Sequence, residues 1–319
     1  MREAAARKPG FWTKLAYGFG AVADGVKTNG FEYFLLLYYG QVLGVDFALV
    51  GATLLIAMIV DAFTDPVVGY WSDNLRTKFG RRHPFMYAAV LPVGIAYFFV
   101  WNPPTGLEGN ELFPYLLAIT IAVRVCFTFY DVPSSALVAE LTDDYDERTS
   151  FLSYRYVFGW MGGLFIAVYA LRFLLVPTEE YGSGFFNVEG YQTYGIVSAI
   201  VIAGSVLICA AGTHSHIPHL RAPPEARKMT VGRVFKEIGE TLSNRSLLWL
   251  FVATLFGFMA NGVASTLNFF INGFFWEFTT SQTALLTLSV FFSALIALVM
   301  SPIVSMTGGM KRGAVAIGI

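Results

Sequence analysis

The chain has 319 residues, of which 55% are hydrophobic, 16% are aromatic and only 13% are charged, whereas roughly 25% of the residues of a soluble domain are charged. This composition excludes an ordinary soluble protein and indicates a protein whose main solvent is lipid. The net charge is −1 and the basic residues form no single patch, so we expect no nucleic-acid partner. The two cysteines, Cys126 and Cys209, lie in apolar stretches without metal or redox spacing, so we expect no bound cofactor.

Long apolar stretches follow one another along the whole chain. A helix rises 1.5 Å per residue, so roughly 20 residues cross about 30 Å of hydrocarbon, whereas barrel strands have about 10 residues with strict alternation. The pattern therefore predicts an all-α polytopic membrane protein with eight spans and the start of a ninth at Ala314. The eight predicted spans are Leu15–Leu43, Val45–Trp71, Pro84–Trp101, Leu112–Ala139, Phe151–Val176, Thr193–Gly212, Leu247–Phe275 and Gln282–Met306.

The connecting segments alternate in charge. The N-terminal segment and the segments after spans two, four, six and eight hold 17 of the 21 Lys and Arg residues. The other loops, residues 41–46, 102–111, 177–192 and 276–281, hold acids and no Lys or Arg. The positive-inside rule then predicts that the N-terminus and the even-numbered turns face the cytoplasm. No small-residue cleavage site precedes the first span, so we expect that span to direct insertion itself.

One long polar segment, residues 213–246, separates six spans from the rest. It is typical of the cytoplasmic linker of a transporter built from two six-helix halves, with the substrate bound between the halves. This predicts an N-terminal six-helix bundle over residues 1–212 and an incomplete C-terminal bundle over residues 247–319. We expect about three or four further spans in the complete product, and a monomer.

Ionisable residues inside predicted spans are costly, at about 2.5 to 3.5 kcal/mol for a charge at the centre of the bilayer, and therefore indicate function or specific pairing. Asp61 and Asp65 are four residues apart on span two, so they share one helix face with Cβ atoms about 6 Å apart. Two carboxylates at this distance in a medium of low dielectric constant favour a bound cation or a shared proton. Thr64 offers a hydroxyl beside them.

Span four offers further oxygen ligands. Thr128 and Asp131 are three residues apart and share a face, so convergence of spans two and four predicts an oxygen-lined cation site. The alternative is a structural cluster in which the acids pair with intramembrane bases. Further charged residues within the spans are Asp24, Lys27, Glu32, Arg124, Arg155 and Arg172. For Glu32 and Arg172, near span ends, we expect the side chains to extend to the interface.

Three segments resemble the glycoside-pentoside-hexuronide:cation symporters of the major facilitator superfamily. They are residues 14–20 (KLAYGFG), residues 61–69 (DAFTDPVVG), and residues 141–149 (LTDDYDERT) with Tyr154 and Arg155. The resemblance implies the major facilitator fold in a bacterial inner membrane and symport of a sugar or glycoside with Na⁺ or H⁺. It also implies that Asp61, Thr64, Asp65, Thr128 and Asp131 bind the coupling cation, and that Asp131 and Arg155 contact sugar hydroxyls, with Asp24, Lys27 and Tyr130 beside the substrate.

The segment between spans two and three is similar to the cytoplasmic signature of the wider superfamily. The similarity rests on Gly69, Asp73, Arg76, Gly80, Arg81 and Arg82. Asp73 can cap a helix end and pair with an arginine, which implies a gating contact that breaks during transport. A basic loop that only anchors the topology is the alternative interpretation.

Two positions depart from the family pattern. The sugar-binding acid of span one falls at Gly25, next to Asp24, and adjacent helix positions point about 100° apart, so Asp24 is expected to pair with Lys27. The sugar-stacking tryptophan of span four corresponds to Ser135. An aromatic face for a sugar then comes from Phe127, Tyr130 or Trp160, or else the substrate is not a galactoside.

Two other functions remain open at this level. A transporter of the same fold could carry a lipid or another small organic solute. A membrane enzyme could use His214, His216 and His219, whose spacing suits a metal, although they lie in the linker. The sequence contains no nucleotide-binding loop, zinc-protease motif or nucleophile elbow, which argues against an ATP-driven pump or a hydrolase.

Overall fold

The computed structural model describes residues 9–219 and 243–292, and within these ranges all regular elements are helices. Six of the helical stretches are long and apolar enough to cross a membrane. The elements are α1 (Phe11–Phe19), α2 (Val22–Asn29), η1 (Gly30–Leu35), η2 (Leu37–Val42), α3 (Phe47–Asn74), α4 (His83–Trp101), η3 (Gly109–Leu112), α5 (Phe113–Leu141), α6 (Tyr145–Tyr169), η4 (Ala170–Leu174), η5 (Gly184–Phe186), α7 (Val188–His214), η6 (Ile217–His219), α9 (Arg245–Phe270), η7 (Ile271–Phe275) and a shorter helix, Thr280–Phe292.

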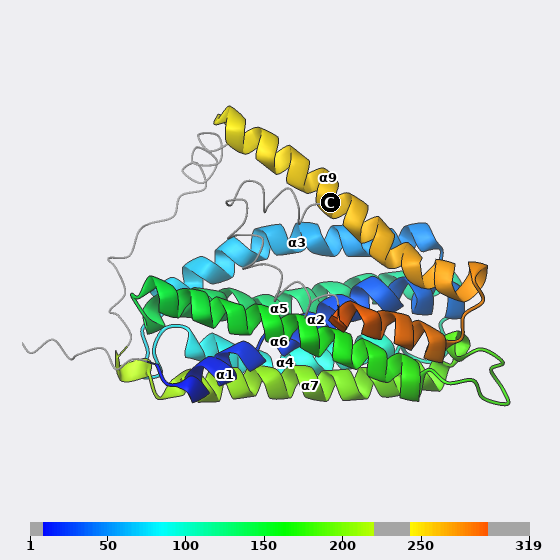
Figure 1. Ribbon diagram of the computed structural model, residues 1–319, viewed down its shortest axis with the longest axis horizontal. Helices are drawn as coiled ribbons and strands as arrows, with labels where there is room; N and C mark the ends of the chain where they lie inside the picture. The colour runs from blue at the N-terminus through cyan, green and yellow to red at the C-terminus, as the bar shows by residue number, and fades with distance from the viewer. Residues whose placement is uncertain (1–8, 220–242, 293–319) are drawn as a thin grey trace, which may run out of the picture.

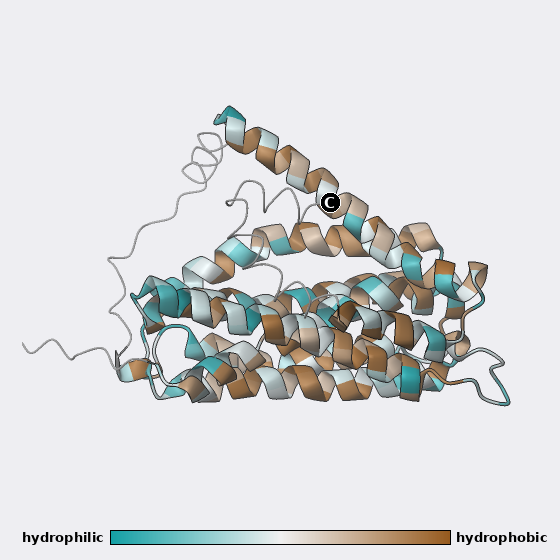
Figure 2. Ribbon diagram, in the orientation of Figure 1, coloured by the Kyte–Doolittle hydropathy of each residue, from teal (hydrophilic) through white to brown (hydrophobic). Residues whose placement is uncertain are grey.

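The helices from α1 to α7 lie alongside one another in a bundle, and α9 crosses above α3 (Figure 1). We call the end with the loop of residues 75–82 the basic end, and the end with residues 43–46, 102–112, 175–187 and 276–279 the acidic end. The end of α9 meets the bundle at the acidic end, where Phe269 packs on Tyr33 and Phe270 on Phe47. Hydrophilic residues gather at the two ends, and hydrophobic residues dominate the helices between them (Figure 2).

Helix ends depart from the predicted spans because polar caps lengthen the helices beyond their apolar parts. Asp144 accepts hydrogen bonds from the backbone N–H groups of Asp146 and Glu147, so α6 begins six residues before the predicted Phe151. Asn187 caps α7 and Asn244 caps α9 in the same way. A capping side chain satisfies backbone donors that a helix end leaves unpaired, and a count of apolar residues does not register this.

The first span is not the single regular helix that the apolar stretch predicts. It is divided into α1 and α2 at Gly20 and Ala21, and then continues in two π-helical segments. Small residues allow this span to lie very close to its neighbours. A Cβ atom at Gly25 would lie 1.8 Å from the carbonyl oxygen of Gly159 in α6, so the backbones of α2 and α6 are in direct contact.

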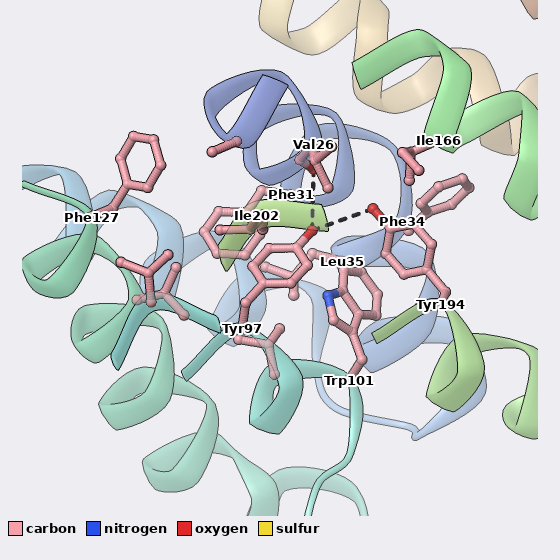
Figure 3. Close-up of a cluster of buried hydrophobic side chains, with 14 of the residues drawn as sticks. Val26, Phe31, Phe34, Leu35, Tyr97, Trp101, Phe127, Ile166, Tyr194 and Ile202 are labelled. Carbon is pink, nitrogen blue, oxygen red and sulfur yellow. Dashed lines mark hydrogen bonds between the residues drawn. The ribbon is translucent and has the colours of Figure 1, made fainter. Parts of the chain in front are cut away.

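Aromatic residues form much of the interior between the first span, α4 and α7. Tyr97 is fully buried, and its hydroxyl donates to the carbonyl oxygen of Val26 at 3.2 Å and lies 3.3 Å from the hydroxyl of Tyr194 (Figure 3). Trp101 packs edge-on against Tyr194. Buried aromatic hydroxyls need partners, and these contacts fix the first span against α4 and α7.

Parts of the sequence predictions lie outside the described residues. These parts are residues 220–242 of the linker, the second half of the span Gln282–Met306 and the start of a span at Ala314. The division into two halves joined by a linker stays a prediction.

Candidate functional site

The intramembrane charges meet along one face of α5. Arg124, Thr128 and Asp131 are spaced i, i+4 and i+7, so their side chains follow one another on a single side of the helix. α3 lies against α5 and contributes Asp61 and Asp65, while α6 contributes Arg155 and α2 contributes Asp24 and Lys27. We call these eight residues the central polar cluster. Spans two and four therefore converge, as the cation-site hypothesis required.

Within the cluster Asp61 has a fixed cationic partner. Arg124 Nη1 lies 2.6 Å from Asp61 Oδ2, and the two side chains are 18% and 24% exposed. Asp61 Oδ1 is buried and has no hydrogen-bond partner among the described residues. Sequence reasoning named both residues but did not pair them. The i, i+7 spacing of Arg124 and Asp131 was the signal that could have placed Arg124 in the site.

Asp65 has a different environment. Its Oδ1 accepts a hydrogen bond from Thr128 Oγ1 at 2.9 Å, and the same hydroxyl lies 3.1 Å from the carbonyl oxygen of Arg124. No Lys or Arg forms an ion pair with Asp65 in the described ranges. The hydroxyl of Thr64 donates to the carbonyl oxygen of Asp61 on its own helix at 3.4 Å, and its role as a cation ligand stays a prediction.

Asp131 forms an ion pair with Arg155 of α6. The other side of the guanidinium donates to Ser134 Oγ at 3.1 Å and to the hydroxyl of Tyr17 at 3.4 Å. A carboxylate and a guanidinium side by side, with two hydroxyls, provide both acceptors and donors for a polar solute. Sequence reasoning predicted Asp131 and Arg155 here. It missed Tyr17, although this residue lies in the segment 14–20 that resembles the symporters, and it missed Ser134, which belongs to none of the three segments.

On the first span Lys27 Nζ lies 2.9 Å from Asp24 Oδ1, in agreement with the predicted pair. The same ammonium lies 3.9 Å from the ring centre of Phe127, a cation–π contact between α2 and α5. Gly25 faces α6 rather than the cluster, which explains why an acid is absent there: any side chain at this position would collide with Gly159.

The three aromatic candidates for a sugar-stacking face differ in access. Tyr130 is 1% exposed, and its hydroxyl packs directly against Gly20 of the first span. The predicted contact with a substrate therefore requires the helices to separate. Phe127 is 3% exposed and has Lys27 above its ring. Trp160 on α6 is 41% exposed. Of the three, only Trp160 presents an open ring.

No group of three His, Cys, Asp or Glu residues in the described ranges is close enough to hold a metal ion. Asp61 and Asp65 of α3 and Asp131 of α5 lie where these two helices meet, and Arg124 and Arg155 each form an ion pair with one of the acids. That the three acids bind one coupling cation stays a prediction. His214 ends α7, and its Nδ1 lies 3.1 Å from the hydroxyl of Tyr87. The side chain of His219 lies outside the described residues, so the alternative of a histidine site stays a prediction.

At the basic end, charged residues join the loop after α3 to the end of α5. Glu140 forms ion pairs with Arg81, at 2.6 Å, and with Arg82, and Arg82 Nη2 lies 3.1 Å from Asp73 Oδ1. Asp73 pairs with the arginines but caps no helix. Arg76 is exposed, Gly69 lies close to Val132 of α5, and Gly80 has a φ of 75°, a backbone conformation that favours glycine. Glu140 was not predicted, because it follows the apolar part of its span.

Known proteins resemble this chain over most of its length. Residues 16–319 match the family described as MFS/sugar transport protein. An uncharacterized symporter of Synechocystis is 36% identical over 189 residues, 56% of this chain and 34% of that protein. A putative glycoside/cation symporter of Escherichia coli is 29% identical over 61% of this chain and 41% of its own length. The sphingosine-1-phosphate transporter of Mus musculus is 30% identical over 48% of this chain and 31% of its own length.

The chain thus spans about half or less of the length of these relatives. Within that length, the helical architecture and the family match agree. Since the match covers nearly the whole chain, the chain belongs to the MFS/sugar transport protein family and is a multi-pass membrane protein of the major facilitator fold.

Proposed function

We propose that the whole protein is a secondary transporter that couples the movement of a sugar or glycoside to Na⁺ or H⁺. The observation that carries this proposal is the charge balance of the central polar cluster. It holds four acids, Asp24, Asp61, Asp65 and Asp131, and three bases, Lys27, Arg124 and Arg155. With all of them ionised the cluster has a net charge of −1, and one monovalent cation or proton neutralises it.

Asp65 is the residue that carries this uncompensated charge, because the other three acids have basic partners. An unpaired carboxylate inside a membrane span is costly, so binding of a cation stabilises the site. Asp61 Oδ1, which has no hydrogen-bond partner among the described residues, and the hydroxyl of Thr128 would supply further oxygen atoms, which hard cations prefer. Asp65 and Asp61 would therefore hold the cation, with Thr128 beside them.

Asp131 and Arg155 would bind the solute, as the resemblance implies. The pair presents charged acceptors and donors next to the hydroxyls of Ser134 and Tyr17, a combination suited to sugar hydroxyls. The relative named as a glycoside/cation symporter supports this class of cargo. If the cation and the solute each order groups of the same cluster, binding of one raises the affinity for the other. By linkage, the two affinities change by the same factor.

A lipid or other organic solute is the second candidate. It is favoured by Ser135, which stands where the family has a sugar-stacking ring, and by the relative named as a sphingosine-1-phosphate transporter. Trp160 offers a ring on α6 instead, and this favours the glycoside.

The experiment is gradient-driven uptake by the full-length protein in proteoliposomes, with radiolabelled melibiose, isoprimeverose and methyl glucuronide as probes. Asp65→Asn removes the uncompensated charge, so we expect uptake driven by a Na⁺ or pH gradient to fall by about tenfold or more, which corresponds to ~1.4 kcal/mol. Insertion and folding should be unaffected, because Asp65 forms no ion pair. Glu179→Gln, in a loop of the acidic end, serves as the control and should leave uptake unchanged. Wild-type coupling in Asp65→Asn would overturn the proposal.

A further inference from the structure

A cavity of about 450 Å³ lies at the acidic end, away from the central polar cluster. Its walls come from η1, from α9 with η7, and from the helix Thr280–Phe292. Its lining includes Tyr33, Ser265, Asn268, Phe269, Asn272 and Thr287. The volume lies in the range of small-molecule sites, roughly 300 to 1,000 Å³.

Polar residues follow one face of α9 into this cavity. Ser265 and Asn268 of α9 and Asn272 of η7 are spaced by three and four residues, the repeat of a single helix face. Carboxamides are costly in hydrocarbon unless they have hydrogen-bond partners. Two of them at the end of a helix as apolar as α9 therefore indicate a face that meets polar groups rather than lipid.

The two asparagines in the cavity satisfy each other only in part. Asn272 Nδ2 donates to Asn268 Oδ1 at 2.7 Å, and Asn272 is 9% exposed. Each carboxamide has two N–H groups and an oxygen with two lone pairs. In the part of the chain that the structure describes, neither makes another side-chain hydrogen bond, so the pair offers both donors and acceptors to the cavity.

The cavity is uncharged, since none of its lining residues is Asp, Glu, Lys, Arg or His. Its aromatic wall is formed by Tyr33 and Phe269, whose ring centres are 4.8 Å apart. Carboxylates and phosphates have strong requirements for cationic partners, which this lining does not meet. Neighbouring hydroxyl groups of an uncharged solute each donate and accept hydrogen bonds. They can therefore pair with the two carboxamides, which lie beside the aromatic wall.

We propose that this cavity is a second, neutral subsite that binds an uncharged, hydroxyl-bearing unit of the transported solute. The inference rests on the proposed function and adds to it that the solute has at least two units. Tyr33 is six residues beyond Lys27 on the first span, about 9 Å along a helix axis. The proposal requires one elongated solute to extend over this separation, from the central polar cluster to the cavity.

The test uses thermal stabilisation of the full-length protein in detergent, because a ligand that binds only the folded state raises its melting temperature. The probes are melibiose and isoprimeverose, each with two sugar units, and methyl galactoside and methyl xyloside, each with one. Asn268→Leu and Asn272→Leu remove the carboxamides at similar volume. Asn261→Leu makes the same change on the same helix outside the cavity and is the matched control.

We expect about tenfold weaker apparent binding of the two-unit probes in Asn268→Leu and Asn272→Leu, with one-unit probes unchanged and with wild-type behaviour in Asn261→Leu. Equal binding of the two-unit probes in wild type and both variants overturns the inference and leaves the proposed function intact. If no sugar stabilises the wild type, the proposed function fails and this inference fails with it.

A second readout does not depend on the folding of the leucine variants. Ser265→Cys, in a background without other cysteines, places a thiol in the cavity that a maleimide can modify. A two-unit probe that stabilises the protein should slow this reaction, and a one-unit probe should not. Modification at the same rate with and without the stabilising two-unit probe overturns the inference.

Discussion

The charges of the central polar cluster act in pairs, and the partner of each acid decides what that acid can bind. Arg124 neutralises Asp61 and Arg155 neutralises Asp131, whereas the partner of Asp65 among the described residues is the hydroxyl of Thr128. A buried pair is costly to break because the charge left behind is uncompensated. While Arg124 is paired with Asp61, Asp65 is the carboxylate on α3 that lacks a cationic partner among the described residues.

Removal of Arg124 should strengthen cation binding at this site. In Arg124→Gln both carboxylates on α3 lack a counter-charge, so we expect the Na⁺ concentration for half-maximal stabilisation of the full-length protein to fall by about tenfold, or ~1.4 kcal/mol. Titration of the melting temperature with NaCl, at ionic strength held constant with choline chloride, measures this. Arg172→Gln, a substitution of a base that contacts Phe173, should behave as wild type. The same midpoint in Arg124→Gln and wild type would contradict the role given to the Arg124–Asp61 pair.

Among the elements, the first span is the least regular and the most tightly packed. Its division at Gly20 and Ala21 and its π-helical segments coincide with close approaches to α6, α4 and α7. At Gly25 the backbone of α2 contacts Gly159 and Gly163 of α6. Close-packed interiors respond to the addition of even one methyl group, so the position of this span depends on glycine at residue 25.

Gly25→Ala should destabilise the protein by about 1–3 kcal/mol through overpacking. The added methyl group would lie 1.8 Å from the carbonyl oxygen of Gly159, so α2 and α6 must separate. The control is Gly204→Ala on α7, where nothing lies within 4 Å of the added atom. Thermal unfolding followed by aggregation or by fluorescence compares the two. A melting temperature of Gly25→Ala equal to that of Gly204→Ala would show that the α2–α6 contact is looser than the structure has it.

At the scale of the whole molecule, the two ends of the bundle differ in the charge of their connecting segments. A network of ion pairs joins helices at the basic end. Glu140 connects the end of α5 to Arg81 and Arg82 at the start of α4, and Asp73 of α3 joins through Arg82. Three helices are thus held together at a place where opening would expose the interior. Its role as a gate, and the orientation of this end toward the cytoplasm, stay predictions.

Glu140→Gln should cost about 3–5 kcal/mol, the usual effect of breaking a buried ion pair, because Glu140 and Arg82 are only 4% and 7% exposed. Asp73→Asn removes the 54% exposed member of the same network, and about 1 kcal/mol or less is expected from an exposed pair. Denaturation of both variants in detergent gives the comparison. Equal losses would mean that the network is held by Asp73 as much as by Glu140.

The sequence alone determined the fold class and the approximate spans, because apolar run length is a local property. Helical spacing also placed Asp61 with Asp65, and Thr128 with Asp131, on shared helix faces, and it paired Lys27 with Asp24. The contact between α3 and α5 was only a condition of the predicted site. Only the tertiary structure decided that Arg124 pairs with Asp61, that Glu140 binds the arginines and that Gly25 contacts α6. These contacts join residues 58 to 138 positions apart, and they depend on how each helix is rotated and how closely the helices approach. One helix's periodicity fixes which residues share a face, but the neighbour that this face meets is fixed by packing of the whole bundle.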